Sequence, residues 1–220
     1  SHWPRWGTWA AAAAVLLGVL YLGRSTLDTL LALGLPRATV ASVTGTLYRV
    51  PQGILEPGAT IGENETVRTG PGSRAVLELA DGSLLDVNER TELSVRAAWS
   101  GRTVHLQRGD IIVKAARQRH GHLRVQTRDA LASVKGTVFA VSSGLSGSLV
   151  SVVEGSVAGA QGGTESLLSP GEQAASNPAL IGSVREAVAW SPDAETYLAI
   201  LASLAVASLT DLYDGKLARK

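Results

Sequence analysis

The sequence predicts an all-β central domain of many short strands (a sandwich, a roll or a short solenoid), with an N-terminal transmembrane helix and a C-terminal apolar α-helix. Three observations predict this. From Thr39 to about Gln173, short apolar runs alternate with clusters of Gly, Pro, Asp and Ser. Residues 6–23 and residues 196–210 carry no charge. We therefore divide the 220 residues into 1–37 (transmembrane helix and juxtamembrane segment), 38–175 (β domain) and 176–220 (linker and C-terminal helix).

The composition excludes several classes of site. The formal net charge is +1, so no overall positive field recruits nucleic acid. The chain has no cysteine, which rules out disulfides and thiolate metal sites. We expect no cofactor, no metal and no small-molecule substrate.

The first segment has the features of a membrane anchor. At about 1.5 Å per residue, an uncharged helix over residues 6–23 spans most of a hydrocarbon core roughly 30 Å thick. Aromatic rings mark both ends and leucines fill the middle, which gives the expected bilayer contacts: Trp3, Trp6, Trp9, Leu16, Leu17, Leu20 and Tyr21. A cleavable signal peptide and a buried helix are the alternatives, but no small-residue cleavage site follows closely. Arginines flank both ends, so the positive-inside rule does not decide the orientation.

The middle of the chain is predicted to be strands joined by glycine turns. Asp81-Gly82 separates two apolar runs and predicts a hairpin. Gly58, Gly109, Gly155 and Gly171 each follow an apolar residue closely, so we expect positive φ and a tight turn at each, as a recurring device and not as a sequence repeat. The expected strands cover residues 40–43, 45–50, 75–79, 84–87, 93–95, 104–106, 110–114, 123–126, 138–141, 149–153 and 156–158.

This region contains a series of sequence blocks in a fixed order: Gly45, Leu47, Leu55-x-x-Gly58, Val67-Arg68-Thr69-Gly70, Ser73, Ala75, Leu77, Leu79, Asp81-Gly82-Ser83, Thr91-x-Leu93-x-Val95, Leu106-x-x-Gly109, Val125-x-Thr127, the run from Val134 to Val141, the run from Val152 to Val157, and Leu168-Ser169-Pro170-Gly171-Glu172. In this order the blocks resemble the FecR family of bacterial membrane-anchored periplasmic proteins. It implies a periplasmic β domain on a single-span protein of the bacterial inner membrane. FecR-type regulators also carry a cytoplasmic sigma-factor-binding domain, and many carry a C-terminal module that meets an outer-membrane receptor. About five residues precede the apolar segment here, and one helix follows the β region, so we expect the domain to have been reused.

The last segment is predicted to be a single apolar helix that starts at Ser191-Pro192-Asp193 and runs to about Leu212 or Tyr213. Apolar side chains cover well over half of its circumference. A narrow stripe of small residues, suited to close helix approach, is the predicted partner-binding face: Thr196, Ala199, Ser203, Ala207 and Thr210. The helix packs on its own β domain, on a partner subunit or at the bilayer interface, and the sequence leaves these open.

A basic stretch is the remaining candidate surface. Lys114, Arg117, Arg119 and Arg124 are predicted to contact anionic lipid headgroups or an acidic partner, with an exposed hairpin as the alternative. His120 and His122 lie within it, but no further ligands follow at the spacing a metal site needs, so we interpret them as part of a solvated turn. The carboxylates Asp81, Asp86, Glu89, Glu92 and Asp110 are spread along predicted turns and form no recognisable acid–base pair.

These observations favour a protein that binds and does not catalyse. The first interpretation is an accessory subunit of a larger respiratory, photosynthetic or transport complex in the membrane, whose FecR-like domain is a scaffold for protein–protein contacts. The second is the proteolysed periplasmic part of a FecR-type transmembrane sigma-factor regulator. The third is a glycan-binding or hydrolytic β domain of the cell envelope, against which the low aromatic content argues.

Overall fold

The computed structural model describes residues 36–217 except 52, 99–100, 118–120 and 162–163. The chain divides into two units, Ser1–Leu35 and Pro36–Lys220. The predicted transmembrane helix and its seven bilayer-contact residues fall in the first unit, which lies outside the described residues. Within the described part, no helix has both the length and the apolar character that crossing a bilayer requires.

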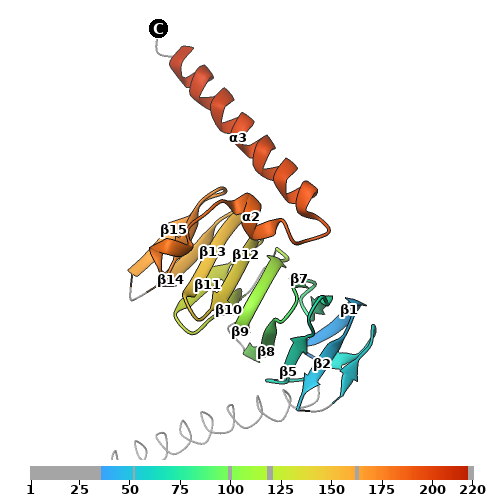
Figure 1. The fold of residues 1–220 in the computed structure, drawn as a ribbon. Coiled ribbons are helices and arrows are strands. Elements are labelled where there is room, and N and C mark those ends of the chain that lie inside the picture. Colours follow the sequence, from blue (N-terminus) through green and yellow to red (C-terminus); the bar gives the residue numbers. More distant parts are fainter. Residues whose placement is uncertain (1–35, 52, 99–100, 118–120, 162–163, 218–220) are drawn as a thin grey trace, which may run out of the picture. The chain divides into compact units, whose positions relative to one another are not determined.

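The second unit is mostly strands, as predicted, with three helical segments at its end (Figure 1). The helical segments are η1 (Pro178–Leu180), α2 (Val184–Val188) and α3 (Ala194–Leu217). The strands are β1 (Ala38–Thr44), β2 (Leu47–Val50), β3 (Ile54–Leu55), β4 (Thr60–Ile61), β5 (Thr66–Thr69), β6 (Arg74–Leu79), β7 (Leu84–Val87), β8 (Glu92–Ala98), β9 (Gly101–Lys114), β10 (His122–Gln126), β11 (Ala130–Val134), β12 (Val138–Gly144), β13 (Gly147–Glu154), β14 (Val157–Gln161), β15 (Thr164–Leu168) and β16 (Gln173–Ala175).

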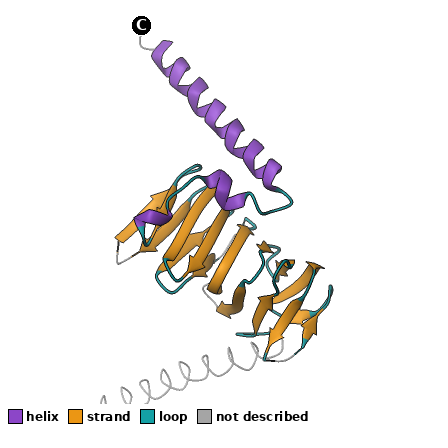
Figure 2. Cartoon of the chain, viewed as in Figure 1, coloured by secondary structure: helices purple, strands orange, loops and turns teal. Residues whose placement is uncertain are grey.

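The strands form two sheets that share the long strand β9 (Figure 2). Its first half pairs with β8 and β10, and its second half pairs with β7 and β12. Sheet A therefore has the order β4-β1-β6-β7-β9-β12-β13-β16, and sheet B has the order β3-β2-β5-β8-β9-β10-β11-β14-β15. The prediction of two strands at 104–106 and 110–114 was wrong, because β9 continues through Gly109.

The core lies between the two sheets. Alternate side chains of sheet A, such as Leu77 and Leu85, and of sheet B, such as Leu93 and Val104, are fully buried in one cluster. Period-2 burial of this kind is what two facing sheets produce, so the arrangement is the sandwich among the three predicted. Phe139, the only phenylalanine, is at its centre with no exposed surface.

The predicted glycine conformations are confirmed. Gly58, Gly109, Gly155 and Gly171 have φ of +87°, +95°, +81° and +86°. The Asp81-Gly82 hairpin is also confirmed, since β6 and β7 pair antiparallel on either side of it. Gly109 differs in one respect: the chain does not turn there, and the glycine is needed because a Cβ would lie 2.5 Å from Thr91 Cα.

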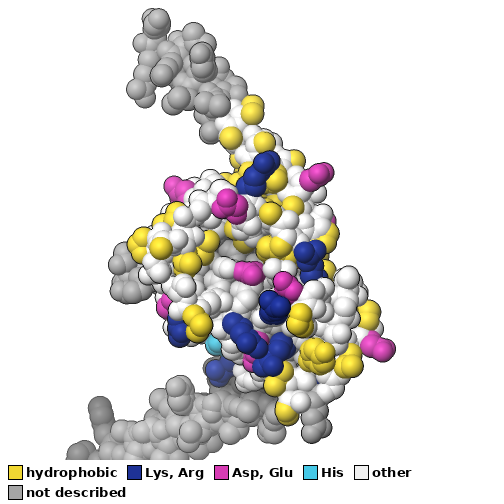
Figure 3. Space-filling view, viewed as in Figure 1, with side chains coloured by type: hydrophobic (Ala, Val, Ile, Leu, Met, Phe, Trp, Pro, Cys, Tyr) yellow, Lys and Arg dark blue, Asp and Glu magenta, His cyan; other side chains and the backbone are white. Residues whose placement is uncertain are grey.

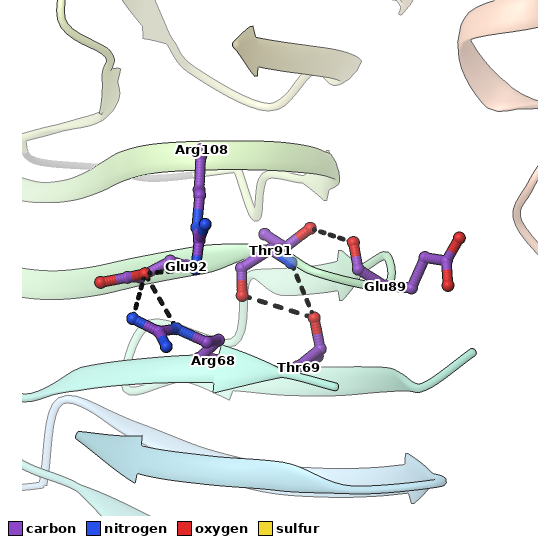
Figure 4. Close-up of polar contacts among 6 residues, drawn as sticks. All are labelled: Arg68, Thr69, Glu89, Thr91, Glu92 and Arg108. Carbon is purple, nitrogen blue, oxygen red and sulfur yellow. Dashed lines mark hydrogen bonds and ion pairs between the residues drawn. The ribbon is translucent and has the colours of Figure 1, made fainter. Parts of the chain in front are cut away.

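In two hairpins of the sandwich, a threonine hydroxyl joins the two strands at the end away from the turn. We did not predict this structural repeat. The Thr91 hydroxyl, at the start of β8, donates to the carbonyl of Asp110 at 3.2 Å. The Thr137 hydroxyl, before β12, donates to the carbonyl of Ser156 at 3.0 Å. Both bonds span 19 residues and both accept at the residue after a positive-φ glycine. Figure 4 shows Thr91 paired with Thr69, whose hydroxyl accepts from the Thr91 amide at 2.9 Å.

Two other expectations need correction. β9 and β10 run parallel, so the basic stretch between them is a crossover and not a hairpin. The segment predicted as a linker contains η1 and α2, and α2 begins with a capping box in which Ser183 and Glu186 bond each other's backbone amides. The sequence interpretation also missed the short strands β3 and β4 and the strands β5, β11, β15 and β16.

Candidate functional site

The base of α3 is joined to sheet A through a group of polar side chains that we call the Asp86 cluster: Asp86, Lys114, Ser191, Asp193 and Tyr197. Asp86 lies on β7 and is buried. Its Oδ2 accepts from the Tyr197 hydroxyl at 2.8 Å and from the Ser191 hydroxyl at 3.3 Å. These bonds join residues more than a hundred positions apart.

Lys114 completes the cluster from the end of β9. Its Nζ donates to Asp193 Oδ2 at 2.7 Å and lies 3.8 Å from Asp86 Oδ2. It also lies 5.3 Å from the centre of the Tyr197 ring, within the range of a cation–π interaction. One cation therefore bridges a carboxylate of the sheet and a carboxylate at the start of the helix.

The environment shifts the acidity of two members. Burial alone would lower the pKa of Lys114, but the hydrogen bond to Asp193 and the nearby Tyr197 and Asp86 outweigh it and raise that pKa above its ordinary value. Burial, reinforced by Asp86, raises the pKa of Tyr197 from 10.0 to about 12. At neutral pH the phenol is therefore protonated and donates to Asp86.

An apolar cluster lies under these polar contacts. Ile112 of β9, Ala140 of β12 and Val153 of β13 face outward from sheet A and are covered by Val184 and Val188 of α2 and by Tyr197 of α3. This explains why the consecutive residues 111, 112 and 113 are all buried, since sheet A is covered on both faces there. Three surroundings were left open for the predicted C-terminal helix: its own β domain, a partner subunit or the bilayer interface. The first turns of α3 pack on the β domain of the same chain.

Beyond its base, α3 presents exposed side chains. Thr196, Ala199, Ser203 and Ala207 of the predicted stripe are exposed, whereas the side chain of Thr210 lies outside the described residues. Leu204 and Val206 are also exposed, at 37% and 64%. The stripe therefore does not pack on the β domain within the described residues.

The described members of the predicted basic contact set lie on separate parts of the fold. Lys114 belongs to the Asp86 cluster, Arg117 is exposed after β9, and Arg124 lies on β10 in sheet B. Arg119 and His120 lie outside the described residues. The described residues include no group of three or more His, Asp or Glu side chains placed to hold a metal ion.

Sheet B has a second charged region on its outer face. In Figure 4 the side chains of Arg68 and Arg108 converge on Glu92. Glu92 Oε2 lies 2.7 Å from Arg68 Nη2 and 3.2 Å from Arg108 Nη2. The space-filling view shows Lys and Arg side chains close to acidic ones on the face turned to the viewer (Figure 3). The two ion pairs of Glu92 link side chains of β5, β8 and β9.

A comparison with known families matches the middle of the chain. The family model described as FecR protein matches residues 65–158. Residues 65–158 are a FecR domain. The FecR domain runs from β5 into β14 and includes Thr69, Thr91, Gly109, Thr137 and Gly155, so the residues that close the two hairpins belong to it.

Solved structures give a weaker likeness. Two crystal structures of a candidate anti-sigma factor from Parabacteroides distasonis, at 2.50 and 1.65 Å resolution, match with a TM-score of 0.48 and 23% identity. The match covers 53% of this chain, and 56% and 57% of those chains respectively, so it spans little more than half of either protein. No curated protein matches the chain.

Asp86 and Tyr197 are the residues that the sequence interpretation missed. Asp86 was assigned to a predicted turn, although it occupies strand 84–87, where polar residues would normally point outward. An acidic residue between Leu85 and Val87 fits ordinary strand alternation, so the residues around Asp86 give no signal; the signal for a covered outer face was the continuous apolar run Ile111-Ile112-Val113 on β9.

Proposed function

We propose that the chain is a non-catalytic regulatory protein of the FecR type, which binds a partner protein in the periplasm through helix α3 and influences a sigma factor across the inner membrane. The observation that carries this is the FecR domain at residues 65–158. It favours the regulator over the accessory subunit of a membrane complex, because sigma-factor regulation is the role that the family resemblance implies.

The arrangement at α3 supports a role in protein–protein contact. The Asp86 cluster fixes the first turns of α3 on the FecR domain through Tyr197 and Lys114. The exposed stripe then projects from a fixed base, which lowers the entropy lost when a partner binds. In this proposal the stripe is the contact face, and a partner bound there acts on sheet A through β7 and β9.

The test is a transcript measurement in the host bacterium. Deleting the coding sequence should change the transcripts of one sigma-factor regulon, and expressing the intact chain should restore them. Ala199→Trp places a bulky group in the exposed stripe and should prevent restoration. Ala205→Trp is the matched control, because at 100° per residue Ala205 lies on the side of the helix away from the stripe.

Two outcomes would overturn the proposal. One is a deletion strain in which no sigma-dependent transcript changes while the chain co-purifies stoichiometrically with a respiratory, photosynthetic or transport complex; this result identifies an accessory subunit. The other is restoration by Ala199→Trp as complete as that by Ala205→Trp, which would remove the stripe from the mechanism.

A further inference from the structure

A polar groove of about 500 Å³ lies on the outer face of sheet B, where β8, β9 and β10 meet. Its side chains include two guanidinium groups, one imidazole and three amides, and we call it the basic groove: Arg96, Arg128, His105, Asn64, Gln107 and Gln126. Within the described part of the chain, none of its lining residues is a carboxylate and none is aromatic apart from His105.

Strand register places these side chains together. Ser94 of β8 and Gln126 of β10 both pair with His105 of β9, so the three form a row across the sheet. Arg96 lies two residues along β8 and therefore points to the same face. The residues between them, such as Val95, Val104 and Val125, point into the core and are buried. The parallel pairing of β9 with β10 is what creates this row.

The two arginines of the groove have little local compensation. The Arg96 side chain is 63% exposed, and the only ion pair it forms among the described residues is to Glu63 at 3.9 Å. Glu63 is also bonded to Arg37 at 2.6 Å, so its charge is shared. Arg128 is exposed and reaches the carbonyl of Gly144 at 3.5 Å.

The nearest remaining carboxylate, Asp129, is turned to other partners. It accepts from the hydroxyls of Ser148, Ser176 and Thr127. Burial raises the pKa of Asp129, but these bonds, together with the nearby charge of Arg128, outweigh it and leave that pKa below its ordinary value. Glu92, on the neighbouring part of the sheet, is held by Arg68 and Arg108. No carboxylate among the described residues lines the groove, so Glu63 and Asp129 offset the charges of its two arginines only from outside it, and a local positive charge is left.

We propose that the basic groove binds an acidic, extended segment of a partner protein. Guanidinium groups bind carboxylates in a bidentate fashion, which accounts for arginine at both positions. The side-chain amides of Asn64, Gln107 and Gln126 can bond the backbone of an extended peptide. A bilayer surface would favour protruding cations over a recessed groove with amides, and a neutral glycan site would favour an aromatic platform. This inference is independent of the proposed function, since the groove is on sheet B and the stripe is on α3.

The experiment measures binding of a fluorescein-labelled peptide of alternating Glu and Ser to the full chain by fluorescence anisotropy. The double variant Arg96→Gln/Arg128→Gln should weaken binding at least tenfold. The matched control Arg74→Gln/Arg185→Gln removes the same charge at two exposed arginines outside the groove and should change affinity less than twofold. A charge-reversed variant, Arg96→Glu/Arg128→Glu, should lose the acidic peptide and bind one of alternating Lys and Ser.

Several results would overturn the inference. Equal weakening by the groove variant and the control variant would mean non-specific attraction, and no binding of the acidic peptide would exclude the groove as a site. If the chain instead binds vesicles containing phosphatidylglycerol more tightly than the acidic peptide, and loses that binding in Arg96→Gln/Arg128→Gln, this result would assign the groove to a lipid surface. The same result with polygalacturonate would assign it to an acidic glycan. Each variant should have the same thermal unfolding midpoint as the natural chain, which confirms that the binding measurements compare folded proteins.

Discussion

Replacing Tyr197 with Phe should loosen the first turns of α3 and leave the sandwich unchanged. The substitution removes the hydroxyl that donates to Asp86 at 2.8 Å and keeps the ring that fills the apolar cluster. A hydrogen bond to a charged acceptor contributes about 1.5–3 kcal/mol. Asp86 keeps its bond from Ser191 and its proximity to Lys114, so it is not left without a partner.

Hydrogen–deuterium exchange measures this loss locally. Amides of residues 194–201 should exchange roughly ten- to a hundredfold faster in Tyr197→Phe, because each 1.4 kcal/mol of opening free energy is about a factor of ten. Amides of β9 and β12 should keep their protection. Ser203→Ala is the control, since its hydroxyl bonds only within the helix, to the Ile200 carbonyl, and about 0.5 kcal/mol or less is expected.

The reasoning is refuted by either of two patterns. Unchanged exchange over residues 194–201 would mean that the Asp86 cluster does not hold the helix. An equal increase in α3 and in β9 would mean that the helix and the sandwich open together, so the cluster would belong to the global fold and not to a separate attachment.

Three further predictions follow from particular contacts. The Tyr197 pKa of about 12 exceeds the ordinary 10.0, so the unfolded state loses its proton first, and the Tyr197 contribution to stability should be full below pH 10 and fall by up to roughly 2 kcal/mol between pH 10 and pH 12. Alkaline denaturation should therefore show a larger loss in the natural chain than in Tyr197→Phe, where Lys114, whose pKa is also raised, still contributes a loss of its own. Gly109→Ala should destabilise the protein by roughly 3 kcal/mol or more in urea denaturation, because the added Cβ collides with Thr91. Gly58→Ala is the control: at φ +87° with open space around it, this substitution should cost only about 1–2 kcal/mol. Equal losses in the two variants would contradict the collision. Phe139→Ala should cost about 3–5 kcal/mol by the same measurement, and a loss below about 1 kcal/mol would mean that the core refills the space.

Features of the candidate site could be predicted only where a single segment determines them. The start of the C-terminal helix and its stripe were predicted, because 3.6-residue periodicity is visible within one stretch of sequence. The Asp86 cluster was not predicted, because it joins β7, β9 and the start of α3, and no local pattern relates residues 86, 114 and 197. The basic groove was missed for the same reason, since it depends on β9 pairing in parallel with β10.

The sequence by itself determined the class of the domain, the Asp81-Gly82 hairpin and the positive φ of four glycines. The hairpin and the φ values depend on steric limits within a few neighbouring residues, and the class depends on apolar runs that alternate with turn residues, so each can be inferred without knowing where the rest of the chain lies. Only the tertiary structure decided that β9 passes through Gly109 and belongs to both sheets, and that α2 and α3 cover the outer face of sheet A. These features are set by which distant apolar faces pack together, and the burial that stabilises them involves residues of many segments at once.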